Sequence, residues 1–212
     1  MTDAVFPVSE FKHAMDFANM SLTAEPNIKN QLIILDFILE VVKEDLKTDL
    51  LSHIFYSEVD FRREINCPFP LYYDNKQGDK LLIIKEENTE VDLTKNCILV
   101  LPWRRNRLHD QIINISTNDF IYDKRNHRAY YFPYISLCYI YNGNHSIASG
   151  IVHKKGMIEA EQFDITKLFE HVHTDGQYWY NSHTNEKTGN ITDFRIGIIY
   201  EIAKIKYNLE TN

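Results

Sequence analysis

The most constraining feature of this sequence is an apolar, aromatic segment that leads through a glycine into a helix-forming segment, at residues 139–150 (Tyr-Ile-Tyr-Asn-Gly-Asn-His-Ser-Ile-Ala-Ser-Gly). Gly143 allows the tight turn that a direct strand-to-helix connection needs. The first N–H groups of a helix have no partner within it and favour negative charge. The segment therefore predicts a corner where turn amides and the Ser146 hydroxyl hold a phosphate, with His145 at its mouth. The alternative is a plain turn in which Asn144 or Ser146 caps the helix.

A second segment of this kind lies upstream, at residues 97–109 (Cys-Ile-Leu-Val-Leu-Pro-Trp-Arg-Arg-Asn-Arg-Leu-His). It predicts a strand that gives way, after Pro102, to a helix with a cationic start. Arg104, Arg105 and Arg107 each carry a forked guanidinium group that can clamp a phosphate or a carboxylate. Three arginines within four helical positions cannot all face the same way, so one or two at most belong to any site. The alternative is a set of surface ion pairs.

The order of these elements resembles the ParB/sulfiredoxin-like superfamily: strand, proline, arginine-rich helix start, a second proline before a strand, then Gly143, Asn144, His145, Ser146 and a helix. Members of that group carry a Gly-x-His-Arg or Gly-x-Arg-Arg box at the second strand-to-helix turn. The resemblance covers residues 80–170 and implies a small mixed sheet with helices that binds a nucleotide or another phosphorylated ligand between the two corners. The form Tyr-Asn-Gly-Asn-His-Ser-Ile also resembles an uncharacterised bacterial family, and no activity can be carried over from that family to this chain.

This chain departs from the superfamily box at one position, because Ser146 stands where an arginine is common. Either an arginine of the other corner supplies the charge or the site has lost that role. The resemblance permits nucleotide hydrolysis, phosphoryl transfer or nuclease action, and leaves open whether the protein is an enzyme. In an enzyme, His145 would do the acid/base work and Arg104 or Arg105 would stabilise charge. A nucleotide would bring Mg²⁺, although no carboxylate pair stands out to hold it.

Length and composition are those of a folded protein, with 212 residues and 44% apolar residues. No apolar run approaches the length that crosses a bilayer, and residues 1–5 lack the pattern of a secretory signal, so we expect a cytoplasmic protein without a membrane segment. The net charge of −7 argues against broad adhesion to nucleic acid. Cys67, Cys97 and Cys138 are far apart and odd in number, which predicts reduced core residues.

The expected fold class is α+β, with residues 1–66 as a helical N-terminal region and residues 67–212 as the ParB/sulfiredoxin-like domain, closed by a C-terminal helix. The prolines at positions 68 and 70 place a boundary near residues 64–70. Apolar periodicity predicts the remaining helices, over 7–22, 107–115, 146–156, 166–172 and 193–207, with one long or two broken helices over 26–51. It predicts strands over 80–85, 97–101 and 157–165, and a hairpin or one interrupted strand over 130–141.

Two other clusters contain candidate binding groups. His171 and His173, followed by Asp175 and His183, are metal-ligand types. On a strand the first two would share a face, but the helix predicted over 166–172 separates them, which favours simple exposure. The tyrosines between 130 and 180, together with Trp179, can stack on nucleic-acid bases or fill a core, and the core is favoured.

Three hypotheses of function follow. The first is binding of a nucleotide or phosphate ligand, with or without catalysis. The second is a non-catalytic module of a bacterial or phage defence or mobile-element system, which binds a protein partner through its N-terminal helices. The third is DNA binding or cleavage, which predicts retention on DNA that weakens steeply with salt.

Overall fold

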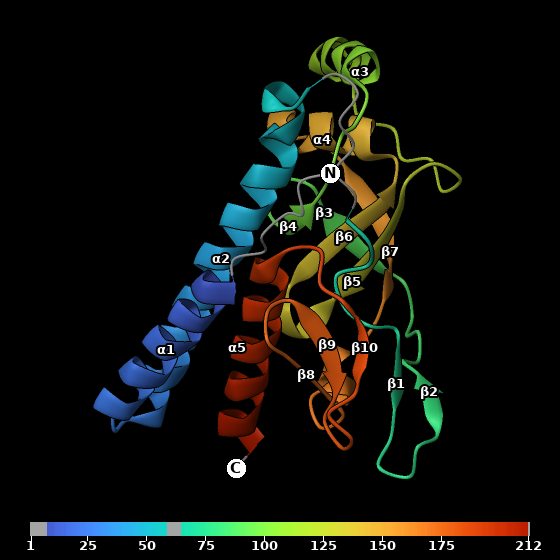
Figure 1. Ribbon diagram of the computed structural model, residues 1–212. Coiled ribbons are helices and arrows are strands. Elements are labelled where there is room, and N and C mark those ends of the chain that lie inside the picture. Colours follow the sequence, from blue (N-terminus) through green and yellow to red (C-terminus); the bar gives the residue numbers. More distant parts are fainter. Residues whose placement is uncertain (1–7, 59–64, 212) are drawn as a thin grey trace. The chain divides into compact units, whose positions relative to one another are not determined.

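The computed structural model describes residues 8–58 and 65–211 and shows a mixed α+β protein (Figure 1). Residues 1–5, where no secretory signal was predicted, lie outside the described part. The chain forms two compact units. Unit 1 combines the chain up to Lys43 with Pro68–Ile83 and Ile165–Asn212, and unit 2 combines Glu44–Cys67 with Ile84–Asp164. Only the change of unit at Pro68 coincides with the domain boundary predicted from the sequence.

Unit 1 contains helices from both ends of the chain, so the N-terminal helices are not a separate region. α1 (Val8–Ala24) packs against α5 (Phe194–Thr211). A Cβ atom at Gly197 of α5 would lie 3.4 Å from the ring of Phe11 in α1, so the glycine allows the two helices to approach closely. An amphipathic helix is stable only when its apolar face is buried against another element. α1 buries this face against the C-terminal helix α5.

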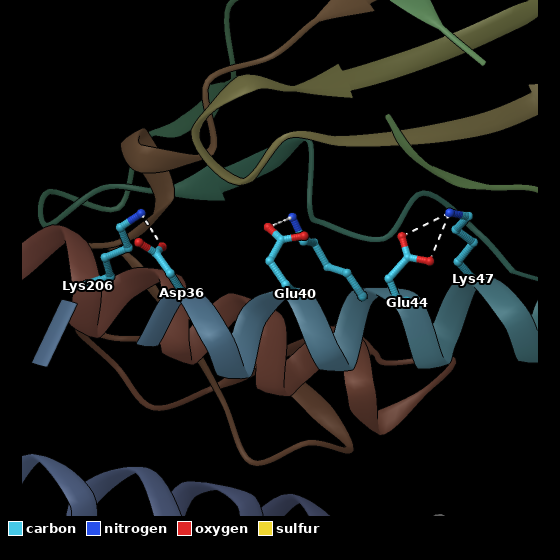
Figure 2. A network of polar contacts seen from close by, with 6 residues as sticks. Asp36, Glu40, Glu44, Lys47 and Lys206 are labelled. Atoms are coloured by element: carbon cyan, nitrogen blue, oxygen red, sulfur yellow. Dashed lines mark hydrogen bonds and ion pairs between the residues drawn. The ribbon is translucent and has the colours of Figure 1, made fainter. Parts of the chain in front are cut away.

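α2 (Ile28–Tyr56) begins in unit 1 and ends in unit 2. Figure 2 shows its polar surface, where Asp36 pairs with Lys206 of α5 at 2.6 Å. Figure 2 also shows the pair between Glu44 and Lys47, which are one helical turn apart, at 2.9 Å. Pairs of this kind between neighbouring helical residues contribute little to stability, because water screens them. The buried residues of α2, such as Leu35 at 0% exposure, therefore contribute most of its stability.

The strands of unit 1 form a hairpin and a small antiparallel sheet. β1 (Tyr72–Asp74) pairs with β2 (Lys80–Leu82), and β8 (Val172–Thr174), β9 (Tyr178–Asn181) and β10 (Lys187–Asn190) form a sheet in the order β10-β9-β8.

The helix predicted over residues 166–172 is wrong. Its first part is a single 3₁₀ turn at Ile165–Leu168, and Val172 already pairs with Asn181 in β8. Leu168, Phe169 and Val172 are all buried, at 0%, 4% and 3% exposure. In so short a segment, the apolar spacing is compatible with a turn followed by a strand as well as with a helix. Pairing with β9 favours the strand.

Unit 2 contains a five-stranded sheet in the order β3-β7-β5-β6-β4. β4 is parallel to β6, β5 is antiparallel to β6 and parallel to β7, and β3 is antiparallel to β7. A 3₁₀ turn at Pro133–Ile135 separates β5 from β6, so the aromatic segment 130–141 is a hairpin rather than one interrupted strand. The strands are β3 (Thr89–Asp92), β4 (Cys97–Leu99), β5 (Arg128–Phe132), β6 (Leu137–Asn142) and β7 (Met157–Gln162).

Two helices pack against each other over this sheet: α3 (Arg105–Thr117), which follows β4, and α4 (Asn144–His153), which follows β6. Leu108 of α3 and Ile147 and Ile151 of α4 share one core cluster with Ile98 of β4 and Ile140 of β6. β4 and β6 are parallel neighbours, so both strands end at the same edge of the sheet. The two strand-to-helix corners predicted from the sequence therefore lie side by side, at the edge where open α/β sheets bind ligands.

The three cysteines are free thiols, and Cys97 and Cys138 are buried in β4 and β6, as predicted. None of the described helices combines the length and the apolar character that a membrane span requires.

Candidate functional site

A cavity of about 350 Å³ lies within unit 2, between α3 and the β6–α4 turn. One corner contributes Trp103, Arg107 and Asp110 to its lining, and the other contributes residues 141–146. The cavity therefore brings the two predicted corners together. A volume of this size is at the lower end of the range for small-molecule sites.

Gly143 makes the second corner possible. Its φ of +87° lies in the left-handed region that L side chains rarely adopt. A Cβ atom there would lie 2.7 Å from Cδ2 of His127 and 2.9 Å from the carbonyl oxygen of Asn126. α4 begins directly afterwards, at Asn144, two residues earlier than predicted. The amides of residues 144–146 thus form its first turn, where N–H groups have no partner within the helix.

His145 joins this turn to the start of α3. Its Nε2 accepts the backbone N–H of Arg104 at 2.9 Å and that of Trp103 at 3.4 Å. A backbone N–H can only donate, so Nε2 is unprotonated and the ring proton is on Nδ1. Burial, followed by the charges of Arg107 and Arg104, lowers the pKa of His145 to about 4. The ring is thus a neutral cap for the N-terminus of α3.

Asn144 makes a parallel connection. Its Oδ1 accepts the backbone N–H of Leu101 at 2.9 Å. Two neighbouring side chains, Asn144 and His145, therefore fix the position of the β4–α3 corner relative to the β6–α4 corner. Both were predicted to contact a ligand, and both use a side-chain acceptor to shape the cavity.

Ser146 belongs to a hydrogen-bond chain with His127. Nδ1 of His127 accepts the backbone N–H of Asp123 at 3.0 Å, so Nε2 carries the proton. That Nε2–H donates to Oγ of Ser146 at 2.8 Å, and the hydroxyl donates in turn to the carbonyl of Gly143 at 3.1 Å. Burial lowers the pKa of His127 against the opposing effect of Asp123. In this arrangement His127 cannot take the hydroxyl proton of Ser146, so the pair is not an activated nucleophile.

The three arginines have different positions. Arg105 donates to the carbonyls of Ile54, at 3.2 Å, and Ser57, so it caps the C-terminal end of α2 away from the cavity. The guanidinium groups of Arg104 and Arg107 lie 4.5 Å and 5.8 Å from the ring centroid of Trp103. Only Arg107 is part of the cavity lining.

The sequence analysis missed Asp110 and Gln111, which line the cavity, as does Asn126 from the loop before β5. Asp110 and Gln111 lie three and four residues after Arg107 on α3, so helical spacing alone would have placed them on the same face. Asn126 has no comparable signal, because the loop that carries it has no regular period.

A model of a protein family described as "Family of unknown function (DUF6710)" matches residues 4–212. The chain belongs to the DUF6710 family. No curated protein and no solved structure matched the chain in the same comparisons. The DUF6710 match includes the whole of both corners, so the cavity is part of the region that defines the family.

Proposed function

We propose that this DUF6710 protein binds a phosphorylated ligand of nucleotide size in the cavity between α3 and the β6–α4 turn. The observation that supports this most directly is that Arg107 and the first turn of α4 line one cavity. The amides of that turn favour anions through their free N–H groups and the helix dipole. A guanidinium group supplies the positive charge that Ser146 cannot supply at the arginine position of the ParB/sulfiredoxin-like box.

Trp103 provides a surface for the remainder of such a ligand. Its side chain is 37% exposed, and the edge of the His145 ring contacts it at a centroid distance of 5.5 Å. Aromatic faces bind nucleobases by stacking. In the proposed complex, the phosphate lies against residues 144–146 and Arg107. The base contacts the part of Trp103 that remains exposed beside the Arg104 guanidinium, which lies 4.5 Å from the ring centroid.

Asp110 is the acidic group of the cavity lining, and its side chain is 75% exposed. Mg²⁺ is commonly held by one or two carboxylates together with the phosphates of a nucleotide. We therefore propose that Asp110 contacts the Mg²⁺ of a Mg²⁺–nucleotide complex. Without the metal ion, this carboxylate weakens the binding of free phosphate.

The proposal is binding rather than acid/base catalysis by His145. The acceptor nitrogen of His145 is occupied by backbone amides, and its pKa of about 4 leaves it neutral at pH 7. The resemblance to the ParB/sulfiredoxin-like superfamily is part of this proposal, since it is the source of the expected ligand class.

The test is a thermal-shift screen of the untagged protein against ATP, CTP, GTP, ADP and inorganic phosphate, each with and without Mg²⁺. A ligand that binds only the native state raises the melting temperature. We expect a nucleotide-dependent rise that Arg107→Ala abolishes. Arg125→Ala is the matched control, because this arginine has a side chain that is 94% exposed and lies outside the cavity lining. An equal rise in Arg107→Ala, or no rise with any ligand, would reject the proposal.

A second candidate function is favoured by a row of exposed apolar side chains on α2. Ile33, Phe37 and Val41 are spaced by four residues and are 64%, 69% and 52% exposed. Rows of this kind on helices commonly bind another protein. Leu35 and Leu39 of the same helix are buried, so substituting them would disturb folding rather than test binding to a partner. Phe37→Asp should leave the melting temperature unchanged and abolish the self-association that light scattering detects in the wild type. A wild-type protein that stays monomeric at all concentrations would reject self-association through this row.

A further inference from the structure

Two histidines of unit 1 face each other. His171 directly precedes β8, and His183 follows β9, whose last residue, Asn181, pairs with Val172. Nδ1 of His171 lies 2.9 Å from Nε2 of His183. Because β8 is a strand and not the predicted helix, the sequence argument that favoured simple exposure of this cluster no longer applies.

Backbone hydrogen bonds hold both histidines in place. The N–H of Ser182 donates to the carbonyl of His171 at 2.8 Å. The N–H of His183 donates to Oδ1 of the buried Asn181 at 2.7 Å. The turn that carries His183 is thus fixed to the segment that carries His171, without any contribution from the two imidazole rings.

The ring of His171 has a further support. It stacks on Tyr73 at a centroid distance of 4.9 Å and an interplanar angle of 19°. A side chain that is already ordered loses little entropy when it binds an ion.

We propose that His171 and His183 form a two-ligand site for a divalent transition-metal ion such as Zn²⁺, Ni²⁺ or Cu²⁺. Imidazole nitrogens suit these ions. Two nitrogens bound at roughly 2.0–2.1 Å to one ion are about 2.9 Å apart in square geometry and about 3.3 Å apart in tetrahedral geometry. The observed separation of 2.9 Å matches the square arrangement, and a tetrahedral ion requires the two rings to move apart by a few tenths of an ångström. When the ion binds, the proton between the two facing nitrogens moves to the other nitrogen of its own ring, so both rings stay neutral and each facing nitrogen offers its lone pair to the ion.

No group of three or more His, Cys, Asp and Glu side chains suited to a metal ion occurs among the described residues. The protein therefore supplies two ligands, and water completes the coordination. Affinity is accordingly lower than in structural zinc sites, which have four protein ligands. Binding links the segment before β8 to the β9–β10 turn and stabilises this sheet. The site lies in unit 1 and does not depend on the function proposed for the cavity of unit 2.

Isothermal titration of the full-length, untagged protein with ZnSO₄ at pH 7.5 tests the site. We expect one ion per chain, and a dissociation constant that rises at least about tenfold in His171→Ala and in His183→Ala, since even loss of a supporting contact to a metal ligand costs about 10–100-fold. His173→Ala is the matched control. His173 is in the same sheet, but its ring stacks on Tyr180 at 5.2 Å.

Electron paramagnetic resonance of the Cu²⁺ complex gives a second measurement, which we expect to show two coordinated imidazole nitrogens in the wild type and one in His183→Ala. His183 is exposed in a turn, so this variant should fold even if His171→Ala does not. Unchanged Zn²⁺ binding in His183→Ala, equal losses in the His173→Ala control, or no Zn²⁺ binding by the wild type would each overturn the proposal.

Discussion

The imidazole of His145 and the backbone of Arg104 form the hydrogen bond that joins the two corners of the cavity, with Nε2 accepting the N–H at 2.9 Å. The two residues are 41 positions apart in the sequence. Arg104, at the N-cap position of α3, provides no side-chain cap of its own, so His145 performs that task from α4. The residue that most suggested catalysis therefore has a structural role in the wall of the cavity.

This bond makes stability depend on pH. The folded-state pKa of His145, about 4, is below the ordinary value of 6.5, so the unfolded chain takes up a proton before the folded chain does. The histidine therefore leaves stability unchanged above about pH 6.5 and lowers it as the pH falls towards 4. We expect a loss of roughly 2–3 kcal/mol in the free energy of unfolding over this range from His145 alone. Urea unfolding at pH 7, 5 and 4 measures it.

His145→Gln is the control for this pH dependence. A glutamine oxygen can accept the same amides and does not titrate, whereas carboxylates elsewhere titrate equally in both proteins. The difference between wild type and variant should therefore vary with pH mainly through His145. Parallel pH curves for the two proteins would show that His145 is not the titrating group.

Gly143 should be far less tolerant of alanine than Gly78. Their φ values are similar, +87° and +85°, but an added Cβ meets His127 and Asn126 at the first position and nothing within 4 Å at the second. Gly78→Ala should cost about 1–2 kcal/mol, from backbone strain alone. Gly143→Ala should cost about 1–3 kcal/mol more, which is the usual range for overpacking. Chemical unfolding of the two variants gives the comparison, and equal costs would contradict the geometry of the turn.

Arg105 and Arg107 should have separable effects. Arg105→Ala removes the donors to the carbonyls of Ile54 and Ser57 and should lower stability by about 1–2 kcal/mol without weakening ligand binding. Arg107→Ala should weaken ligand binding without lowering stability. Melting temperatures with and without the nucleotide found in the ligand screen distinguish the two variants. A loss of binding in Arg105→Ala, once stability is accounted for, would place this arginine in the site.

Ser146 should not react as a nucleophile. Its hydroxyl proton is directed to the carbonyl of Gly143, and the neighbouring nitrogen of His127 is a donor. A fluorophosphonate probe should therefore fail to label the protein, as judged by intact mass. Ser146→Ala should cost about 1–3 kcal/mol, because it leaves the buried Nε2–H of His127 without its acceptor. Labelling that disappears in Ser146→Ala would contradict this arrangement.

The sequence predicted the local parts of the fold well. The helices α1, α2 and α5 have long apolar periods, and the β6–α4 corner has a glycine at the one position where the backbone needs it. Two strands that each lead into a helix were also visible as a pattern, whereas their parallel pairing, which brings the two corners together, was not. Features of this kind depend on residues close together in the chain.

The missing parts depend on residues that are far apart. Arg105 meets Ile54 across 51 positions and Asn144 meets Leu101 across 43, and no local pattern encodes either contact. The short strand β8 exists because it pairs with β9, and its own three residues have no distinctive period. The division into units also depends on contacts between distant segments. The apolar faces of α1 and α2 show that these helices are covered, but not which segment of the chain covers them.

The chain passes between its two units four times, at residues 43/44, 67/68, 83/84 and 164/165. Neither unit is therefore a continuous stretch of sequence. A fragment of residues 84–164 would contain both corners of the cavity but would lack Ile54, which belongs to its core, and the carbonyls that Arg105 caps. The cavity is therefore built from segments that are discontinuous in the sequence, and experiments on the proposed ligand need the whole chain rather than an excised fragment.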